Sequence, residues 1–278
     1  MCGIIGYVGE RESRSILLNG LKSLEYRGYD SSGLALIHPT KKAICLRKAR
    51  GKIAALEKLL KTKPVSGKTG IAHTRWATHG APNQVNAHPH FDCKGEIAVV
   101  HNGIIENYVA LKAELQGEGH TFLSQTDTEV IVHLIEKYYR DCTLEEAVRK
   151  ALARLQGSFA IGVISWREPG TLIGARFGSP LVVGVGKGEN FLASDVPAIL
   201  DSTQDIIFLG ENEMAVLTKD AYRITDLKGT ALTKKPVRIK WDITQAQKGG
   251  YKHFMLKEIN EQPKILHDVI NARLRRGT

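Results

Sequence analysis

Residues 2–9 have the sequence CGIIGYVG, a nearly continuous apolar run that follows directly on the initial methionine. A run this short and this apolar predicts a buried β-strand at the beginning of the chain. The segment lacks a basic stretch followed by an apolar core, so we do not expect a signal peptide. The first predicted element is therefore a strand with Cys2 at its head.

Short apolar runs of the same kind recur along the chain and predict a fold rich in strands. They are often β-branched and are bounded by Gly, Pro or Asp, as strands usually are. Several are apolar almost throughout, so we expect both faces of those strands to be covered. The runs are 33–38, 69–76, 96–105, 158–166, 171–177, 181–186 and 213–218.

Helical periodicity appears between the strand-like runs. The periodic segments are 13–25, 107–117 and 126–140. Thr143-Leu-Glu-Glu146 has the form of a capping box and predicts a helix that ends near Gly157. From Ser158 to about Thr233 short strands and turns dominate. Strands gathered apart from helices favour an α+β class of packed layers over a doubly wound parallel sheet.

The composition changes near residue 236 and suggests the end of a domain. The segment 241–263 is WDITQAQKGGYKHFMLKEINEQP, which contains Gly249-Gly250 and Pro263. We treat these residues as breakers of regular structure. We therefore expect one domain over 2–240, and over 241–278 a linker with a short helix that leaves the domain.

The chain has an ordinary globular composition but an excess of basic residues. Its formal net charge is +10, from 39 Lys and Arg against 29 Asp and Glu. Because these residues are spread along the chain without a known nucleic-acid-binding motif, we favour a solvated basic surface and expect no nucleic acid partner. No run of about 18 apolar residues occurs, so we expect no membrane-spanning helix and no membrane partner.

The four cysteines are scattered, and none is paired at CxxC spacing. They are Cys2, Cys45, Cys93 and Cys142. This pattern argues against a disulfide framework and against a zinc ribbon. A reducing cytoplasm is the simplest location for the chain, and it would keep a reactive thiol usable.

Cys2 is the first candidate for chemistry. Removal of Met1, which the small side chain of Cys2 favours, would give Cys2 a free α-amine. The reference pKa is about 7.7–8.0 for that amine and about 8.5 for a thiol, so the amine can take the thiol proton near neutral pH. One residue would then supply both the nucleophile and the base. The alternative is a small buried cysteine, since many chains begin with Met-Cys by chance.

The motif YRGYDSSG at 26–33 predicts a tight turn between the first helix and the next strand. Arg27 could hold a carboxamide or a carboxylate near the nucleophile. The alternative is an ordinary helix C-cap with Gly28.

The motif TGIAHTRWATHG at 69–80 predicts a strand that delivers Arg75 and Trp76 to a loop ending in glycine. The planar fork of Arg75 suits a bidentate carboxylate. Trp76 and Thr78 could wall and orient a small ligand. The alternative for Arg75 is a structural ion pair.

Asn102 and Gly103 come at the end of an apolar strand and offer two adjacent hydrogen-bond donors. An amide group and a backbone N–H side by side can form an oxyanion hole. The alternative is a hairpin turn, for which Asn-Gly is a common signal, but helical residues follow. Asp127, in Thr126-Asp-Thr-Glu129, begins a predicted helix. It could complement the helix dipole or pair with the α-ammonium group of an amino acid.

Five histidines lie within a short span, namely His73, His79, His88, His90 and His101. They lack the carboxylate context and the i, i+4 helical spacing of zinc hydrolases, so we expect no metal site. The segment GVGKG at 184–188 lacks the full frame of a phosphate-binding loop and predicts a turn between strands.

Six motifs in sequence order resemble the glutaminase domain of class II glutamine amidotransferases. The resemblance is closest to the branch that makes glucosamine 6-phosphate from glutamine and fructose 6-phosphate. It runs from Cys2 to HFMLKEINEQP at 253–263. The phosphoribosyl-pyrophosphate amidotransferases of the family differ at the YRGYDSSG and RWATHG motifs. The six motifs are CGIIGYVG, LEYRGYDSSG, GIAHTRWATHG, NAHPH, HNGIIEN and TDTEV.

The resemblance implies a four-layer αββα sandwich of two packed antiparallel sheets, of the N-terminal nucleophile hydrolase type. It implies that Cys2 attacks the carboxamide of L-glutamine, that ammonia leaves, and that water hydrolyses a γ-glutamyl thioester. It implies no metal or organic cofactor. The implied positions are Asn102 and Gly103 for the oxyanion hole, Arg75 for the α-carboxylate, Asp127 for the α-ammonium group, Trp76, Thr78 and His79 for the closing loop, and Arg27 for support beside the nucleophile.

Family members of this branch continue after the KEINEQP-like segment into two sugar-phosphate isomerase lobes, which this chain lacks. The resemblance therefore implies a glutaminase whose fructose-6-phosphate site lies on a missing isomerase domain, and a homo-oligomeric full-length form. Two alternatives stay open: the glutaminase domain of another class II amidotransferase, and a catalytically silent domain that binds glutamine or a partner. A retained Met1 would favour the silent domain.

Overall fold

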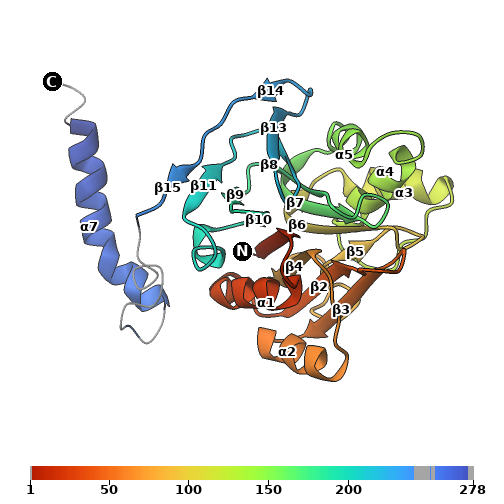
Figure 1. The fold of residues 1–278 in the computed structure, drawn as a ribbon, viewed down its shortest axis with the longest axis horizontal. Helices are drawn as coiled ribbons and strands as arrows, with labels where there is room; N and C mark the ends of the chain where they lie inside the picture. Colours follow the sequence, from red (N-terminus) through yellow and green to blue (C-terminus); the bar gives the residue numbers. More distant parts are fainter. Residues whose placement is uncertain (1, 241–250, 252–253, 275–278) are drawn as a thin grey trace. The chain divides into compact units, whose positions relative to one another are not determined.

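The computed structural model describes residues 2–240, 251 and 254–274 (Figure 1). The chain divides into two units, Met1–Ile239 and Lys240–Thr278. The first unit contains both β-sheets, and the described part of the second contains helix α7 (Phe254–Leu274). The linker expected to begin at 241 falls largely outside the described residues, so the domain boundary stays a prediction.

The first sheet has eight strands, and β1 lies near its centre. Each pairing in it is antiparallel, and β1 pairs with β10 on one side and with β4 on the other. Gly3 lies opposite Thr74, so the beginning of β1 meets the end of β4. The strands are, in spatial order, β15 (Val237–Arg238), β11 (Asp205–Phe208), β9 (Val182–Val185), β10 (Glu189–Ala193), β1 (Gly3–Gly9), β4 (Thr69–Arg75), β2 (Ser31–Ile37) and β3 (Ile44–Arg50).

The second sheet has seven strands, which are also antiparallel. Its longest pairing joins β6 to β7 and places Asn102 opposite Ala160. The strands are, in spatial order, β14 (Ala231–Leu232), β13 (Tyr222–Asp226), β12 (Glu213–Leu217), β8 (Leu172–Phe177), β7 (Gly157–Ser165), β6 (Ile97–Ile105) and β5 (His90–Phe91).

Helices cover the outer face of each sheet, which completes the four-layer αββα arrangement (Figure 1). Helices α1 (Ser13–Ser23) and α2 (Ile53–Thr62) pack on the first sheet, next to the short helix η1 (Glu25–Arg27). Helices α3 (Tyr108–Gly117), α4 (Glu129–Tyr138) and α5 (Leu144–Leu152) cover the second sheet. A second short helix, η2 (Val196–Ala198), contacts α1. The expected α+β sandwich is confirmed.

Two apolar cores hold the layers together. The inner core joins the facing surfaces of the sheets, with Ile4 and Ile71 from the first sheet and Val100 and Ala160 from the second. The outer core joins the second sheet to α3, α4 and α5. Every residue of β1 is buried, as the uniformly apolar run predicts. Burial on both faces fixes the position of this strand, and with it the position of Cys2.

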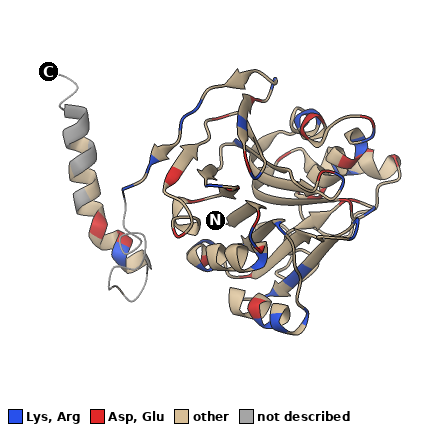
Figure 2. Cartoon of the chain, viewed as in Figure 1, with Lys and Arg blue, Asp and Glu red and all other residues tan. Residues whose placement is uncertain are grey.

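The sequence predicts the long apolar strands better than the short strands and those that contain polar residues. All eight predicted runs are strands at nearly the predicted bounds. Strands β3, β10, β11 and β13 and helix α2 were not predicted. In β3 the sequence ICLRKAR carries basic residues because the strand lies at the sheet edge, where one side is solvated. Acidic and basic residues are interspersed over the elements of the first unit rather than collected on one of them (Figure 2).

Two helix bounds differ from the predictions. Helix α5 ends at Leu152 rather than near Gly157, because Gly157 already begins β7. The prediction that Pro263 breaks the helix is wrong, since α7 continues through it to Leu274. An internal proline removes one hydrogen bond but leaves those on both sides, and the flanking Glu261, Gln262 and Lys264 favour helix. Within the described residues, no helix is long and apolar enough to cross a membrane.

Candidate active site

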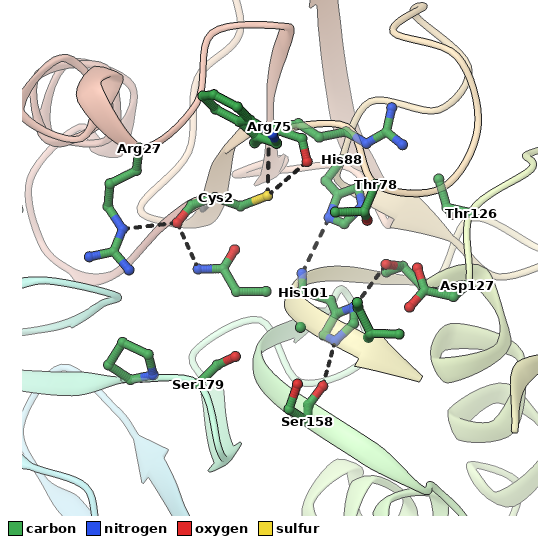
Figure 3. Close-up of a pocket in the computed structure, with 16 residues that line it drawn as sticks. Cys2, Arg27, Arg75, Thr78, His88, His101, Thr126, Asp127, Ser158 and Ser179 are labelled. Carbon is green, nitrogen blue, oxygen red and sulfur yellow. Dashed lines mark hydrogen bonds between the residues drawn. The ribbon is translucent and has the colours of Figure 1, made fainter. Parts of the chain in front are cut away.

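A pocket of about 390 Å³ lies beside the beginning of β1, the end of β4 and the C-terminal part of β6 (Figure 3). It brings together residues that are far apart in the sequence. Of the nine predicted site residues, eight line the pocket: Cys2, Arg27, Arg75, Trp76, Thr78, Asn102, Gly103 and Asp127. The ninth, His79, is not among the lining residues, but its Nδ1 lies 4.0 Å from an Asp127 carboxylate oxygen.

The sulfur of Cys2 faces the backbone of Trp76. The Trp76 N–H donates to Sγ at 3.2 Å, and the thiol donates to the Trp76 carbonyl at 3.5 Å. Burial raises the pKa of the Cys2 thiol, although the Trp76 N–H and the charges of Arg75 and Arg27 act in the opposite direction. The thiol is therefore protonated at neutral pH, and attack by the sulfur needs a base.

Arg27 holds the backbone of the candidate nucleophile. Its Nε donates to the Cys2 carbonyl at 3.1 Å, and its Nη1 pairs with Asp195 at 2.9 Å. Tyr26 also donates to Asp195, at 2.7 Å, and burial together with this carboxylate raises the pKa of Tyr26 to about 12. The sequence did not predict Asp195, because an aspartate before a short helix indicates only a cap.

The YRGYD turn packs tightly against the end of β4. A Cβ atom at Gly28 would lie 2.7 Å from the Arg75 carbonyl carbon, so only glycine allows this approach. Asp30 holds both sides of the junction: its N–H donates to the Arg75 carbonyl at 3.1 Å, and its carboxylate accepts from the Ala77 N–H at 2.7 Å. Asp30 lies within the YRGYDSSG motif, but its two hydrogen bonds to the Arg75 and Ala77 backbone could not be predicted from the sequence.

Asn102 points its amide group toward Cys2. Its Nδ2 donates to the Cys2 carbonyl at 3.0 Å, and its Oδ1 lies 3.0 Å from His73 Nε2. The same His73 nitrogen lies 3.1 Å from the His101 carbonyl oxygen. Because both neighbours are acceptors, His73 Nε2 carries the proton and fixes the amide with its NH₂ group toward Cys2.

Gly103 has a backbone conformation that requires glycine. Its φ is +137°, and a Cβ atom would lie 2.0 Å from the Ser158 carbonyl oxygen. The position belongs to β6, where Gly103 lies opposite Phe159, so Asn102-Gly103 does not form a hairpin turn. Within the strand, the pair presents an amide side chain and a neighbouring glycine to one pocket.

Arg75 organises the loop that follows β4. Its guanidinium donates to the carbonyls of Ala81 and Gly80, each at 3.3 Å, and to that of His79. The side chain is buried, which lowers its pKa, and the charge of Asp127 is among those that oppose this shift. Trp76, whose exposed fraction is 45%, directly follows Arg75 at the beginning of the loop. The arginine therefore holds the conformation of the loop and also contributes its positive charge to the pocket.

Asp127 reaches the pocket from the segment before α4. It is 4% exposed, and one carboxylate oxygen accepts from the Ile105 N–H at 2.8 Å. The helix itself begins at Glu129, and its N-cap is Thr128. The buried carboxylate therefore contacts β6 rather than capping the helix, which leaves its other oxygen facing His79.

Four of the five clustered histidines are buried, and two of them, His88 and His101, line the pocket. The His73 and His88 rings stack at 4.2 Å, and His90 contacts His88 edge to face. Burial lowers the pKa of His73 to about 3 and also lowers those of His88, His90 and His101. These rings are therefore neutral, and they act as hydrogen-bonding parts of the core.

A family model described as a glutamine amidotransferase domain matches residues 61–226. The chain belongs to this family. The match includes Arg75, Asn102, Gly103 and Asp127, and the family that the sequence resembles is thereby confirmed. The fold, the family and the pocket beside the beginning of β1 therefore all agree for this amidotransferase chain.

Several curated relatives of the amidotransferase chain carry the same name. The isomerizing glutamine–fructose-6-phosphate aminotransferase of Aquifex aeolicus (strain VF5) is 56% identical over 274 residues, which is 99% of this chain and 46% of the relative. The enzyme of the same name from Pyrococcus horikoshii is 51% identical, over 99% of this chain and 46% of the relative. The chain therefore spans about half the length of these relatives.

Solved structures share the fold. The glutamine phosphoribosylpyrophosphate amidotransferase of B. subtilis, complexed with ADP and GMP, superposes with a TM-score of 0.70 at 26% identity, over 81% of this chain and 49% of that one. A class II glutamine aminotransferase domain protein from Silicibacter pomeroyi gives 0.56 at 15% identity, over 81% of this chain and 99% of that one. The second likeness supports the fold alone.

Proposed function

We propose that this amidotransferase domain hydrolyses L-glutamine to glutamate and ammonia through a thioester on Cys2. The observation that carries the proposal is the pocket itself, which is lined by a half-buried cysteine, an oriented amide group, an arginine and a carboxylate. The substrate is taken from the family description, and the roles of the residues follow from their chemistry.

Asp127 and Arg75 are suited to the two charged groups of an α-amino acid. The buried Asp127 carboxylate would pair with the α-ammonium group, and the Arg75 guanidinium would take the α-carboxylate. Arg75 already binds the carbonyls of the loop after β4, so a bound carboxylate would also favour one loop conformation. Trp76, Thr78 and His79 on that loop would then cover the side chain of glutamine.

The reaction begins with attack of Cys2 Sγ on the carboxamide carbon. The developing oxyanion would be stabilised by Asn102 and by the Gly103 N–H. The Asn102 amide has two N–H bonds; one binds the Cys2 carbonyl, and the other is available to the oxyanion. Breaking the carbon–nitrogen bond releases ammonia and leaves the thioester, and water then attacks the thioester to release glutamate.

The base is proposed to be the α-amine of Cys2. The sulfur's hydrogen bonds within the described residues are to the Trp76 backbone, which offers no titratable group. An α-amine has a pKa of about 7.7–8.0, so it can take the thiol proton during attack and return it to the departing ammonia. This role requires removal of Met1, which lies outside the described residues.

The acceptor of the ammonia is proposed to be fructose 6-phosphate, bound by a separate isomerase domain. The named relatives are about twice as long as this chain, so such a domain would lie in the half that they have beyond it. We propose the same division for this protein, with glutaminase over 2–240 and, over 241–278, a linker and the start of the sugar-phosphate isomerase portion. A cytoplasmic location and a homo-oligomeric full-length form belong to the same proposal.

Ammonia release from glutamine alone tests the proposal. The chain, with loss of Met1 verified by intact mass, should produce ammonia and glutamate in equal amounts. Cys2→Ala should abolish turnover without changing the fold. Cys142→Ala, at a cysteine whose thiol contacts the Tyr138 carbonyl outside the pocket, should keep it.

Two outcomes would contradict the proposal in different ways. No ammonia from correctly processed chain would identify a silent domain that binds glutamine without hydrolysing it. Ammonia release that survives Cys2→Ala would keep the activity but refute the nucleophile.

A further inference from the structure

A second group of reactive side chains lies outside the pocket, on the helix-covered side of the second sheet. It consists of Cys93, from the turn between β5 and β6, His120, from the segment after α3, and His133 and Glu136 from α4. One ligand atom from each of the four lies within 4.8 Å of all the others. We call this group the Cys93 cluster.

The two sulfur–nitrogen distances within the Cys93 cluster match the edges of a metal-centred tetrahedron. Cys93 Sγ lies 3.7 Å from His120 Nδ1 and 3.6 Å from His133 Nδ1. Zinc–sulfur and zinc–nitrogen bonds of about 2.3 and 2.1 Å give a tetrahedral S···N edge of about 3.6 Å. One Glu136 oxygen lies 2.8 Å from His120 Nδ1 and 3.1 Å from His133 Nδ1. These are hydrogen-bond distances, which would lengthen toward the edge of about 3.4 Å for nitrogen and oxygen ligands when an ion replaces the shared proton.

The surroundings of His133 provide an independent observation. Its side chain is 1% exposed, and its Nε2 has no hydrogen-bond partner among the described residues. That nitrogen lies 3.8 Å from a Glu129 carboxylate oxygen. With Nδ1 bound to a metal ion, Nε2 would carry the proton and face this carboxylate, the arrangement that commonly orients metal-binding histidines.

The other supporting contacts hold the cluster in place. Glu129, the first residue of α4, accepts from the Leu123 and Ser124 N–H groups, each at 2.7 Å, so its carboxylate is fixed against the segment before the helix. The Thr121 N–H donates to Cys93 Sγ at 3.4 Å, a contact that stabilises a thiolate. These contacts pre-organise the ligand atoms before an ion enters.

We propose that Cys93, His120, His133 and Glu136 bind a single Zn²⁺ ion. One sulfur, two imidazole nitrogens and one carboxylate oxygen form a ligand set that suits zinc and is too soft for magnesium or calcium. Four protein ligands leave no open position for a substrate, so the ion has a structural role.

The position of the Cys93 cluster determines how an ion could enter and which segments the ion would hold together. Cys93, His120 and Glu136 line a pocket of about 480 Å³, which gives an ion access from solvent. The ion would tie two loops to α4, whose first residue, Glu129, lies two positions after Asp127. Binding would therefore hold the segment that carries Asp127, although the zinc site does not depend on the proposed glutaminase activity.

Cobalt substitution tests the site directly. The chain, stripped of metal with a chelator and dialysed, should take up one Co²⁺ per molecule. It should then show a sulfur-to-cobalt charge-transfer band and the visible absorption of a tetrahedral ion. Zn²⁺ should displace the cobalt and remove both features. Uptake of no ion, or an octahedral spectrum without the sulfur band, would overturn the proposal.

Variants locate the site. Cys93→Ser should remove the charge-transfer band, whereas Cys142→Ser and Cys2→Ala should retain it. Glu129→Gln removes the supporting carboxylate without removing a ligand and should weaken zinc binding about 10–100-fold. A band that persists in Cys93→Ser would place the metal elsewhere and refute the assignment, and Glu129→Gln tests it even if Cys93→Ser does not fold.

Discussion

At the scale of single residues, the orientation of Asn102 depends on a histidine that the sequence could not place. The sequence identifies Asn102 as a candidate donor, but either end of an amide can face a pocket. His73 settles the orientation because its Nε2 proton is shared between two acceptors, one of which is Asn102 Oδ1. This information comes from pairing across two sheets, which no local motif contains.

Asn102→Ala should lower kcat by about 10²–10³-fold, the usual effect of removing one oxyanion-hole donor. KM for glutamine should change little, because the amide is proposed to contact the oxyanion rather than the α-amino or α-carboxylate groups. Steady-state ammonia release measures both constants. Asn19→Ala, on the exposed side of α1, serves as the matched control.

The Asn102 experiment separates a catalytic effect from a structural one. Asn102 also holds the Cys2 carbonyl, so its loss could displace the nucleophile. The rate of Cys2 alkylation by iodoacetamide would report such a displacement. A kcat that stays within a few-fold of the parent chain would remove Asn102 from the oxyanion hole.

At the scale of elements, predictability follows burial. Strands buried on both faces, such as β1 and β4, give uninterrupted apolar runs that the sequence reveals. The edge strand β3 carries basic residues, and β14 and β15 are only two residues long, so neither pattern nor length indicates a strand. Their pairing is imposed by neighbouring strands and not by their own sequences.

Helix α5 is an element whose local signal was correct. Thr143 Oγ1 accepts from the Glu146 N–H at 3.3 Å, and Glu146 accepts from the Thr143 N–H at 3.1 Å. Thr143→Ala should therefore lower the free energy of unfolding by about 1 kcal/mol. Urea unfolding followed by circular dichroism would measure the loss.

A matched variant tests the cause of the loss at Thr143. Thr143→Ser keeps the accepting oxygen and should retain most of the stability. Glutaminase activity should be unaffected in both variants, because α5 contributes no residue to the pocket. Equal losses in the alanine and serine variants would argue that the methyl group, not the cap, carries the effect.

At the scale of the whole molecule, the candidate residues that line one pocket could be named from the sequence because their motifs occur in a recognisable order. The Cys93 cluster was not, because its four ligands come from three segments without a metal-binding spacing. The histidines that cluster visibly in the sequence lie between 73 and 101, and the fold buries four of them, His73, His88, His90 and His101, in the core. His120 and His133 become neighbours only when α3 and α4 pack together on the second sheet.

The buried histidines make the stability of the whole first unit depend on pH. In the unfolded chain a histidine binds a proton below a pH of about 6.5. In the folded chain, burial lowers the pKa of His73 to about 3 and also lowers the pKa values of His88, His90 and His101. Below a pH of about 6.5, the unfolded state therefore binds more protons than the folded state.

The free energy of unfolding should consequently fall as the pH decreases from about 7 to about 5, by up to about 1.4 kcal/mol per pH unit for each such histidine. His133 partly offsets this slope, because contacts with Glu129 and Glu136 outweigh burial and raise its pKa. The glutamates with a pKa of about 2, Glu129 and Glu136, add to the slope mainly below this range.

Urea unfolding at a series of pH values measures the slope, and calorimetry in two buffers measures the proton uptake. A free energy that stays level over this range would show that the four rings are protonated in the folded chain.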